Sequence, residues 1–437
     1  MKDTVVLFWF RRDLRINDNH ALYRALQSDW PVVPIFIFDK NILNSLPMND
    51  KRVNYIYDTL YQLNHELFTK YQSGIEFYYD YPESAFEQLI EKYNVVGVYT
   101  NKDYEPYAIQ RDKTIREFLQ MRGIELFLCK DHVIFEENEI LKSDGKIYNV
   151  YTHYSKAWKN RFQEVYSTGL NTFPSEKYLH NLLKRDEPSI LPSLKSMNFE
   201  KVNYVLKPLN ISDELLHNYA TSRDRIDAEN GTTNASVYLR FGTISTRELV
   251  NIAMKNNLKL LDELIWREFY QMILFHYPES SIQNFKSDYS IQWENNETYF
   301  ELWKEGKTGF PIIDAAMREL NETGYMHNRC RMIVANFLTK ILLIDWRWGE
   351  KYFAEKLMDY EMASNVGNWQ WSAGTGVGAA PYFRIFNPYL QQEKFDPEYK
   401  YVKKWIDNFN PENYIKPIVD YEKRRSVFLR KRPLIKQ

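Results

Sequence analysis

The sequence has little cysteine and no long apolar run. Only Cys129 and Cys330 are present, too few for the disulfide framework of a small secreted domain. No stretch approaches the roughly 20 apolar residues that span a bilayer, and the chain enters a strand-like run at once, without the apolar core of a signal peptide. These absences predict a cytoplasmic protein with no membrane partner.

The usual signatures of hydrolytic and metal chemistry are also missing. The histidines are scattered, and the chain has neither a Walker loop nor a nucleophile elbow, so we predict no metal site. The run GTGVG at Gly374–Gly378 follows no predicted strand and is interpreted as a turn rather than a dinucleotide fingerprint. Lysine and arginine total 57 against 58 for aspartate and glutamate, so affinity for nucleic acid would need a local basic patch.

The first third of the chain alternates short apolar runs with helical patterns. The apolar runs begin at Val5, Val32, Gly74, Val95 and Ile124. Continuous apolar runs of this length are typical of parallel strands that are buried on both faces. We therefore predict an α/β domain over residues 1–135, with a doubly wound, five-stranded parallel sheet.

The remainder of the chain has a different pattern. A chain of 437 residues exceeds what one hydrophobic core usually organises, which favours two domains. Residues 136–211 carry no sustained period and are predicted to be an interdomain connection, whereas apolar spacing over residues 212–437 predicts an all-α domain. Eight of the 11 tryptophans follow residue 260, and this excess points to a role beyond ordinary packing.

Three segments of the predicted helical domain combine aromatic and polar side chains. The run ELIWREFY places Glu263, Trp266, Arg267 and Tyr270 on one helix face. Pattern alone favours the simpler interpretation, an ion pair between helices beside a core tryptophan.

The other two segments also have simple interpretations when taken singly. The run YMHNRCRMIVANF places Asn328 and Met332 on one face near two arginines, as at a capped helix start. The run from Asp359 places Trp369 and Trp371 in a glycine-rich stretch, as in a turn with core tryptophans. Together, the three segments offer aromatic walls, a carboxylate, amides and arginines, which suit a base-like ligand beside a phosphate backbone.

These segments resemble the most characteristic ones of the photolyase and cryptochrome family. The resemblance rests on DELIWREFY, GKTGFPIIDAAMREL, GYMHNRCRM and NWQWSAGTGVGAAPYFRIFNP, and extends from FWFRRDLRINDNHAL to KFDPEYKYVKKW. It is closest to class I photolyases for cyclobutane pyrimidine dimers. The resemblance implies a monomeric, light-driven DNA repair enzyme, a deoxyribodipyrimidine photolyase, with one noncovalent FAD in the helical domain. Photolyases are among the known base-flipping enzymes, so a flipped dimer is implied as well.

The resemblance also implies a set of FAD contacts. They are Tyr219, Thr232, Thr233, Asn234, Ala235, Ser236, Glu263, Arg267, Asn328, Arg331, Asp359, Glu361 and Asn365. Arg331 and Asp359 correspond to a salt bridge beside the flavin, and Asn365 to the side chain that faces flavin N5. Since an asparagine cannot supply the proton that an aspartate could, we expect the active state to be FADH⁻. Two positions depart from the family pattern, because Glu361 is usually Asp and Tyr325 is often Trp.

The implied substrate pocket uses the aromatic and polar residues of all three segments. Trp266 and Trp371 would sandwich the flipped dimer, while Glu263 and Asn328 would hydrogen-bond the pyrimidine edges beside Met332. The DNA phosphates or the cavity rim would meet Arg223, Arg267, Arg329 and Arg384. Trp369, Trp346 and Trp293 match the tryptophan chain that carries electrons to oxidised flavin, which accounts for part of the late tryptophan excess.

Alternatives within and outside the family stay open. A photolyase for (6-4) photoproducts needs paired histidines, and only His327 lies in the equivalent segment. A DASH-type relative usually has Tyr where Trp371 stands. A cryptochrome photoreceptor typically carries a long extension, and few residues follow the last matched segment. A flavin-free nucleic-acid-binding module would leave the hydroxyl-rich residues from Thr232 to Ser236 without a role.

The predicted α/β domain has a further implied ligand. The family often holds a second, light-harvesting chromophore there, and NKDYEPYAIQRD from Asn101 lies in the relevant region. A folate, a deazaflavin, another flavin or no chromophore are all compatible with these residues.

Overall fold

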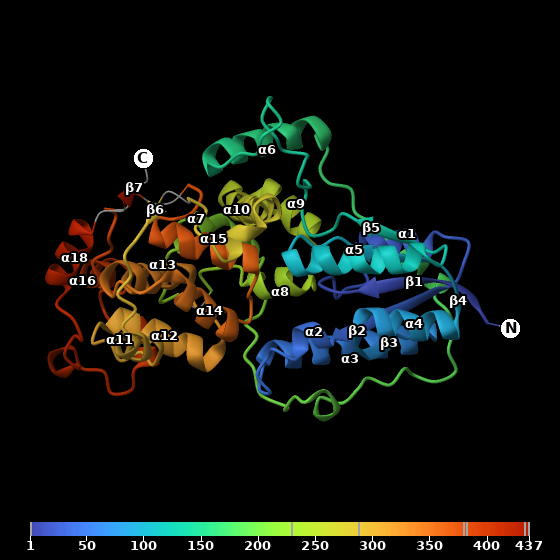
Figure 1. Ribbon diagram of the computed structural model, residues 1–437, viewed down its shortest axis with the longest axis horizontal. Coiled ribbons are helices and arrows are strands. Elements are labelled where there is room, and N and C mark those ends of the chain that lie inside the picture. The colour runs from blue at the N-terminus through green and yellow to red at the C-terminus, as the bar shows by residue number, and fades with distance from the viewer. Residues whose placement is uncertain are drawn as a thin grey trace. The chain divides into compact units, whose positions relative to one another are not determined.

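A computed structural model describes residues 2–228, 230–286, 289–378, 381, 383–431 and 434–435. The chain forms two compact units, labelled by element in Figure 1. Unit 1 contains Met1–Glu139, Phe162–Tyr204 and Ser236–Ile252, and unit 2 contains Ile140–Arg161, Val205–Ala235 and Ala253–Gln437. Both units are therefore built from segments that are separated in the sequence.

Unit 1 is organised by a parallel sheet. Its strands are β1 (Thr4–Phe10), β2 (Val32–Asp39), β3 (Glu76–Asp80), β4 (Asn94–Asn101) and β5 (Glu125–Cys129). The order is β3-β2-β1-β4-β5, and every neighbouring pair is parallel, so the predicted five-stranded sheet is confirmed. Helices lie along both faces of the sheet (Figure 1), and the side chains from Val5 to Phe10 are buried, which explains the continuous apolar runs.

The helices of unit 1 connect the strands and extend the unit. They are α1 (His20–Leu26), α2 (Lys40–Leu43), α3 (Lys51–Tyr71), α4 (Pro82–Lys92), α5 (Pro106–Gln120) and α9 (Thr246–Asn256, whose last turn belongs to unit 2), with short 3-10 helices η1 (Ser175–Asn181) and η2 (Lys195–Met197). A buried ion cluster attaches α9 to the N-terminal residues. Arg247 contacts Asp18 at 3.0 Å and Asp131 at 2.7 Å, and Arg15 contacts Asp131 at 2.8 Å.

The residues around Glu76 attach a later segment to the edge strand of the sheet. The Glu76 carboxylate accepts hydrogen bonds from Lys92 at 2.8 Å, Tyr93 at 2.5 Å and Arg185 at 2.5 Å. Burial alone would raise the pKa of Glu76, but these three donors outweigh burial and lower the pKa to about 2.

We expect Glu76→Gln to destabilise the protein in a pH-dependent way. The amide oxygen still accepts hydrogen bonds, so only the charge-assisted part is lost, about 1.5 kcal/mol at pH 7. A carboxylate with a depressed folded pKa stabilises above its unfolded pKa and loses that effect as the pH falls. The difference in free energy of unfolding between the two proteins should therefore be full above pH 4.5 and should vanish near pH 2. Urea titrations across this range measure it, and a difference that is independent of pH would contradict the assignment.

Unit 2 is helical, as predicted. Its helices are α6 (Tyr151–Val165, whose last turn belongs to unit 1), α7 (Asp213–Ser222), α10 (Leu258–His276), α11 (Glu297–Lys304), α12 (Pro311–Thr323), α13 (Asn328–Asn336), α14 (Trp346–Lys356), α15 (Met362–Ala373), α16 (Pro388–Phe395), α17 (Lys400–Trp405) and α18 (Tyr421–Arg430). A π-helical turn, η4 (Phe337–Ile341), follows α13, and α8 (Ala235–Phe241) begins at the border of the two units.

The structure differs from the sequence pattern in two details. Residues 136–211, which show no sustained period, contain helix α6. The helical unit also includes a pair of two-residue antiparallel strands, β6 (Tyr289–Ser290) and β7 (Leu434–Ile435). Across the described ranges, none of the helices has the length and apolar character needed to cross a membrane. The core of unit 2 surrounds Trp303, Leu338 and Trp369.

Candidate functional site

Helix α10 carries the first group of expected site residues. Its N-cap Asn257 accepts hydrogen bonds from the main-chain N–H groups of Lys259 and Leu260, and its buried residues turn Glu263 and Trp266 toward a partly exposed face. The Glu263 carboxylate forms an ion pair with Arg223, the C-cap of α7. Burial lowers the pKa of Arg223, but the bond to Glu263 outweighs burial and raises it.

Arg267 joins α10 to the start of α15. Its guanidinium donates to the Glu361 carboxylate at 3.0 Å, and Gln271 donates to the same oxygen at 3.0 Å. Only 13% of the Arg267 side chain is exposed, so the guanidinium is engaged inside the protein. Ser364 donates to the second Glu361 oxygen at 3.2 Å. The glutamate that departs from the family pattern thus connects two site helices.

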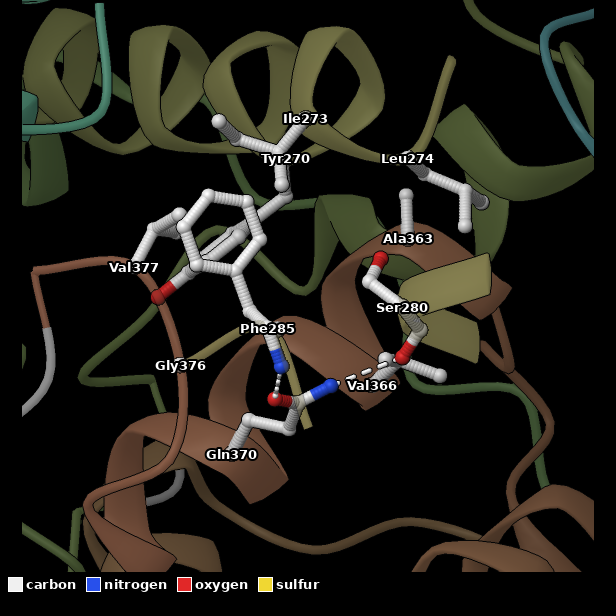
Figure 2. A pocket seen from close by; sticks show the side chains of 11 residues that line it. Tyr270, Ile273, Leu274, Ser280, Phe285, Ala363, Val366, Gln370, Gly376 and Val377 are labelled. Carbon is white, nitrogen blue, oxygen red and sulfur yellow. Dashed lines mark hydrogen bonds between the residues drawn. The ribbon is translucent and has the colours of Figure 1, made fainter. Parts of the chain in front are cut away.

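The same two helices approach closely around a small cavity. It is lined by Tyr270, Ile273, Leu274, Ser280, Phe285, Ala363, Val366, Gly367, Gln370, Gly376 and Val377. Figure 2 shows Gln370 on one side, where its amide nitrogen donates to the Ser280 carbonyl at 2.7 Å and its oxygen accepts from the Phe285 N–H at 2.8 Å. The cavity has room for about one water molecule. It is therefore a packing junction between α10 and α15, too small for a flavin or a base.

Glycines mark the closest approach and the end of α15. A Cβ on Gly367 would lie 2.2 Å from the Tyr270 ring, so only glycine lets α15 approach α10 this closely. Gly374 ends α15 with φ of 91°, a left-handed conformation that suits glycine. This confirms that the GTGVG run begins as a turn.

Arg331 and Asp359 form the ion pair expected beside a flavin. Arg331 donates to Asp359 Oδ2 at 2.8 Å and to the Met326 carbonyl at 2.8 Å. Burial lowers the pKa of Arg331, but Asp359 outweighs burial and raises it. Asp359 Oδ1 is buried without a hydrogen-bond partner among the described residues. An N–H or O–H group of a bound FAD fits this acceptor, because a buried carboxylate oxygen is costly to leave unpaired.

Asn365 is oriented by a residue that the sequence patterns did not indicate. Its amide nitrogen donates to the Glu350 carbonyl at 3.1 Å and to the Glu350 carboxylate at 3.0 Å. Asn365 Oδ1 is therefore the acceptor on the opposite side of the amide. Burial raises the pKa of Glu350, although hydrogen bonds from Asn365 and Tyr360 oppose the rise. No local motif marks Glu350, since its partner lies on another helix.

The hydroxyl-rich segment turns into the start of α8. Thr233 Oγ1 accepts the Ala235 N–H at 3.3 Å, and Thr232 Oγ1 donates to Asn234 Oδ1 at 3.1 Å. Asn234 has φ of 54°, and Ser236 lies in the first turn of α8. Tyr219 lies buried on α7. The turn gathers the threonine hydroxyls within a few residues, as a phosphate grip requires.

The start of α13 presents the second group of expected pocket residues. Asn328 is exposed, and its amide nitrogen lies 3.9 Å from the Met332 sulfur, so the two side chains share a face as predicted. Arg329 contacts Asp224 at 2.9 Å. His327 caps the helix by accepting the Arg329 N–H at 3.0 Å. Burial lowers the pKa of His327 to about 4, so this histidine is neutral at pH 7.

Arg384, which follows α15, lies beside Trp371 in the last turn of that helix. The Arg384 guanidinium lies 5.7 Å from the Trp371 ring centroid, within cation–π range. The Arg384 carbonyl accepts a hydrogen bond from the buried Lys340 at 2.9 Å. Asn336 accepts the Phe386 N–H at 2.8 Å. Two residues near the π-helical turn thus anchor the segment that carries Arg384.

The three tryptophans of the expected electron-transfer chain have different surroundings in unit 2. Trp369 is buried, and in the described part of the chain its ring packs on Trp303 at 6.2 Å and on Phe353 at 5.0 Å. Trp346 is buried, and its indole donates to Asn284 at 2.9 Å. Trp293 is partly buried against the core of unit 2. Trp303 was not singled out from the sequence, although the late tryptophan excess includes it.

Comparisons with known proteins agree with this architecture. Residues 6–175 match the family model described as DNA photolyase, and residues 260–412 match the FAD binding domain of DNA photolyase. A deoxyribodipyrimidine photo-lyase of Vibrio cholerae is 36% identical over 97% of this chain and 98% of that protein. The chain belongs to the DNA photolyase family. Its helical domain is accordingly an FAD-binding domain of that family.

Solved structures of other photolyases share the fold. A bacterial class III photolyase from Agrobacterium tumefaciens superposes with a TM-score of 0.86 at 29% identity, covering 99% of this chain and 97% of that one. An archaeal photolyase from Sulfolobus tokodaii, solved with two FAD molecules, superposes with a TM-score of 0.80 at 34% identity, covering 98% and 99%. The α/β and helical architecture of this photolyase is therefore that of the family.

Proposed function

We propose that this photolyase splits cyclobutane pyrimidine dimers in DNA with light and fully reduced FAD. The observation that carries the proposal is the linked pair of helices α10 and α15. Glu263 and Trp266 lie one turn apart on α10, and Arg267 bonds to Glu361 at the start of the helix that bears Asn365 and Trp371. A carboxylate, two indoles and an amide are thereby held on connected helices.

The residues of unit 2 fit an FAD. Asp359 Oδ1 offers an unpaired buried acceptor, Asn365 turns its oxygen away from Glu350, and the turn from Thr232 supplies hydroxyls. Because Asn365 cannot deliver a proton, it suits the anionic reduced form. When bound, FADH⁻ would supply one electron after absorbing blue light and would recover it once the two C–C bonds that join the pyrimidines have broken, so no net redox change results.

The protein positions the lesion and stabilises its transient charge. Trp266 and Trp371 stack on the flipped pyrimidines, each stack contributing roughly 1 to 3 kcal/mol. Glu263 and Asn328 hydrogen-bond the pyrimidine edges, and Met332 packs beside them. A dimer pairs and stacks poorly in the duplex, so its extrusion costs less than that of an intact base, which contributes to selectivity.

The proposed function also includes arginines that contact the DNA backbone and a second, light-harvesting chromophore. The side chains that meet the DNA backbone are Arg223, Arg329 and Arg384, since phosphate contacts position a protein on DNA. Arg267, which pairs with Glu361, belongs to the cavity rim instead. The two FAD molecules of the archaeal relative support a flavin among the light-harvesting chromophores compatible with unit 1.

The test is illumination of purified, fully reduced enzyme with an oligonucleotide that contains one thymine dimer. We expect dimer loss in the light and none in the dark, with a (6-4) oligonucleotide left intact. An intact thymine dimer after illumination of FAD-loaded enzyme would refute the repair function and favour a photoreceptor. Repair of the (6-4) lesion instead would move the protein to the other repair class.

Glu263→Ala is expected to slow dimer splitting by about 10- to 100-fold, because a hydrogen-bonding group that positions the lesion is removed. The FAD content should be unchanged. Glu301→Ala is a matched control, since Glu301 is an exposed carboxylate on α11 that pairs with Lys304 at 2.8 Å. Single-turnover splitting after a light flash measures the rate, and an unaltered rate in Glu263→Ala would remove this role.

A further inference from the structure

A close, parallel ring stack involves a side chain to which the proposed function assigns no role. Tyr151, at the start of α6, stacks on Trp266 of α10, with ring centroids 3.5 Å apart and planes inclined by 5°. Offset aromatic pairs usually have centroids 4.5 to 7 Å apart, so this stack is unusually close and overlapped. The Tyr151 ring covers one face of the Trp266 indole, which is the ring that the proposed function stacks on the lesion.

Tyr151 is held in place by its own hydroxyl. The hydroxyl donates to the Asp262 carbonyl at 2.8 Å, and burial raises the pKa of the phenol. The Asp262 carboxylate is in turn paired with Lys159 of α6 at 2.6 Å. Both the main chain and the side chain of Asp262 are therefore bound to α6, a few residues before Trp266.

Further along α10, a second attachment lies just after Trp266. The Trp158 indole donates to the Glu268 carboxylate at 2.7 Å, and Tyr154 donates to the same oxygen at 3.3 Å. Since α6 is attached to α10 on both sides of Trp266, the backbone that carries Tyr151 is fixed beside the indole, and the Tyr151 hydroxyl bond holds the ring itself. If Tyr151 only filled the pocket until DNA bound, we would not expect its helix to be attached to α10 in this way.

On the basis of the proposed function, we propose that Tyr151 is a positioning residue that holds Trp266 in the plane needed to stack on a flipped dimer. On the same helix, Tyr270 lies 5.5 Å from Trp266 at 28° and abuts Gly367 of α15. The indole is thus oriented by rings from α6 and α10. A side chain ordered before binding loses less conformational entropy on binding, which increases affinity for the ligand that matches its orientation.

The experiment compares dark binding of fully reduced enzyme to two duplexes that are identical except for one central thymine dimer. For Tyr151→Leu, we expect the Kd for the dimer duplex to rise about 3- to 10-fold, as loss of one aromatic contact predicts. The Kd for the undamaged duplex and the FAD content should not change. Tyr151→Phe keeps the ring and should retain the wild-type ratio of the two Kd values.

Phe162→Leu is the matched control, because it removes a buried ring of α6 that packs on Tyr166 at 5.5 Å, three turns after Tyr151. It should lower the Tm without changing the ratio of Kd values. If Tyr151→Leu does not yield folded protein, Tyr151→Met, whose unbranched side chain adapts better to the space left by the ring, repeats the test. A wild-type ratio in the ring-deletion variant, or tighter binding of the dimer, would overturn the inference. A wild-type enzyme without preference for the dimer would instead refute the proposed function.

Discussion

Trp369→Phe should stop light-driven reduction of oxidised FAD while leaving dimer splitting by chemically reduced enzyme unchanged. Phenylalanine fills much of the indole's volume but cannot donate an electron as tryptophan can. Trp369 lies one helical turn after Asn365 on α15, is buried, and contacts Trp303. We therefore propose that Trp369 passes electrons between the remaining aromatic residues and the cofactor region.

Absorbance spectra during anaerobic illumination with an external reductant measure the reduction, and dithionite-reduced enzyme provides the repair assay. Trp405→Phe is a matched control, since Trp405 is also packed against the core of unit 2 but lies on α17. Normal photoreduction in the Trp369 variant would remove it from the electron path. Loss of repair in the chemically reduced variant would show a role in the substrate site instead.

The sheet was predictable because each strand is marked in the sequence by its own apolar run. Strands buried on both faces are continuously apolar, and β1 and β2 are buried along almost their whole length. The packing of α9 in unit 1 had no such signal. It depends on charged residues such as Arg247, whose partners Asp18 and Asp131 lie more than 100 residues away, and local periodicity carries no information about such pairs.

The site was predictable where its residues share one helix. Glu263 and Trp266 were placed together by helical spacing alone, and so were Asn328 and Met332. Glu350 and Tyr151 were not identified, because each acts on a residue of a different helix and their contacts exist only after packing. The family resemblance supplied the chemistry for the residues that lie within its motifs, but it drew attention to neither of these two.

Gly349→Ala should destabilise unit 2 and disturb photoreduction together. An ideal Cβ on Gly349 of α14 would lie 2.2 Å from Trp369 Cη2 and 2.5 Å from Cζ3, and both atoms belong to a rigid, buried ring. Overpacking of this kind costs about 1 to 3 kcal/mol, and the gain of about 1 kcal/mol from alanine in a helix offsets part of it. The rigid ring places the overpacking cost at the upper end of its range, so we expect the free energy of unfolding to fall by about 2 kcal/mol, measured by urea unfolding.

Replacing Trp369 with phenylalanine should relieve part of this clash, because phenylalanine lacks the outer ring atoms that the new methyl group would meet. In the double variant Gly349→Ala/Trp369→Phe, the loss of stability should be smaller than the sum of the two single losses. Relief would be incomplete, since Leu338 also lies 2.6 Å from the ideal Cβ. Strict additivity in this cycle would mean that α14 and α15 move apart to admit the methyl group, and that the position of Trp369 is not set by contact with Gly349.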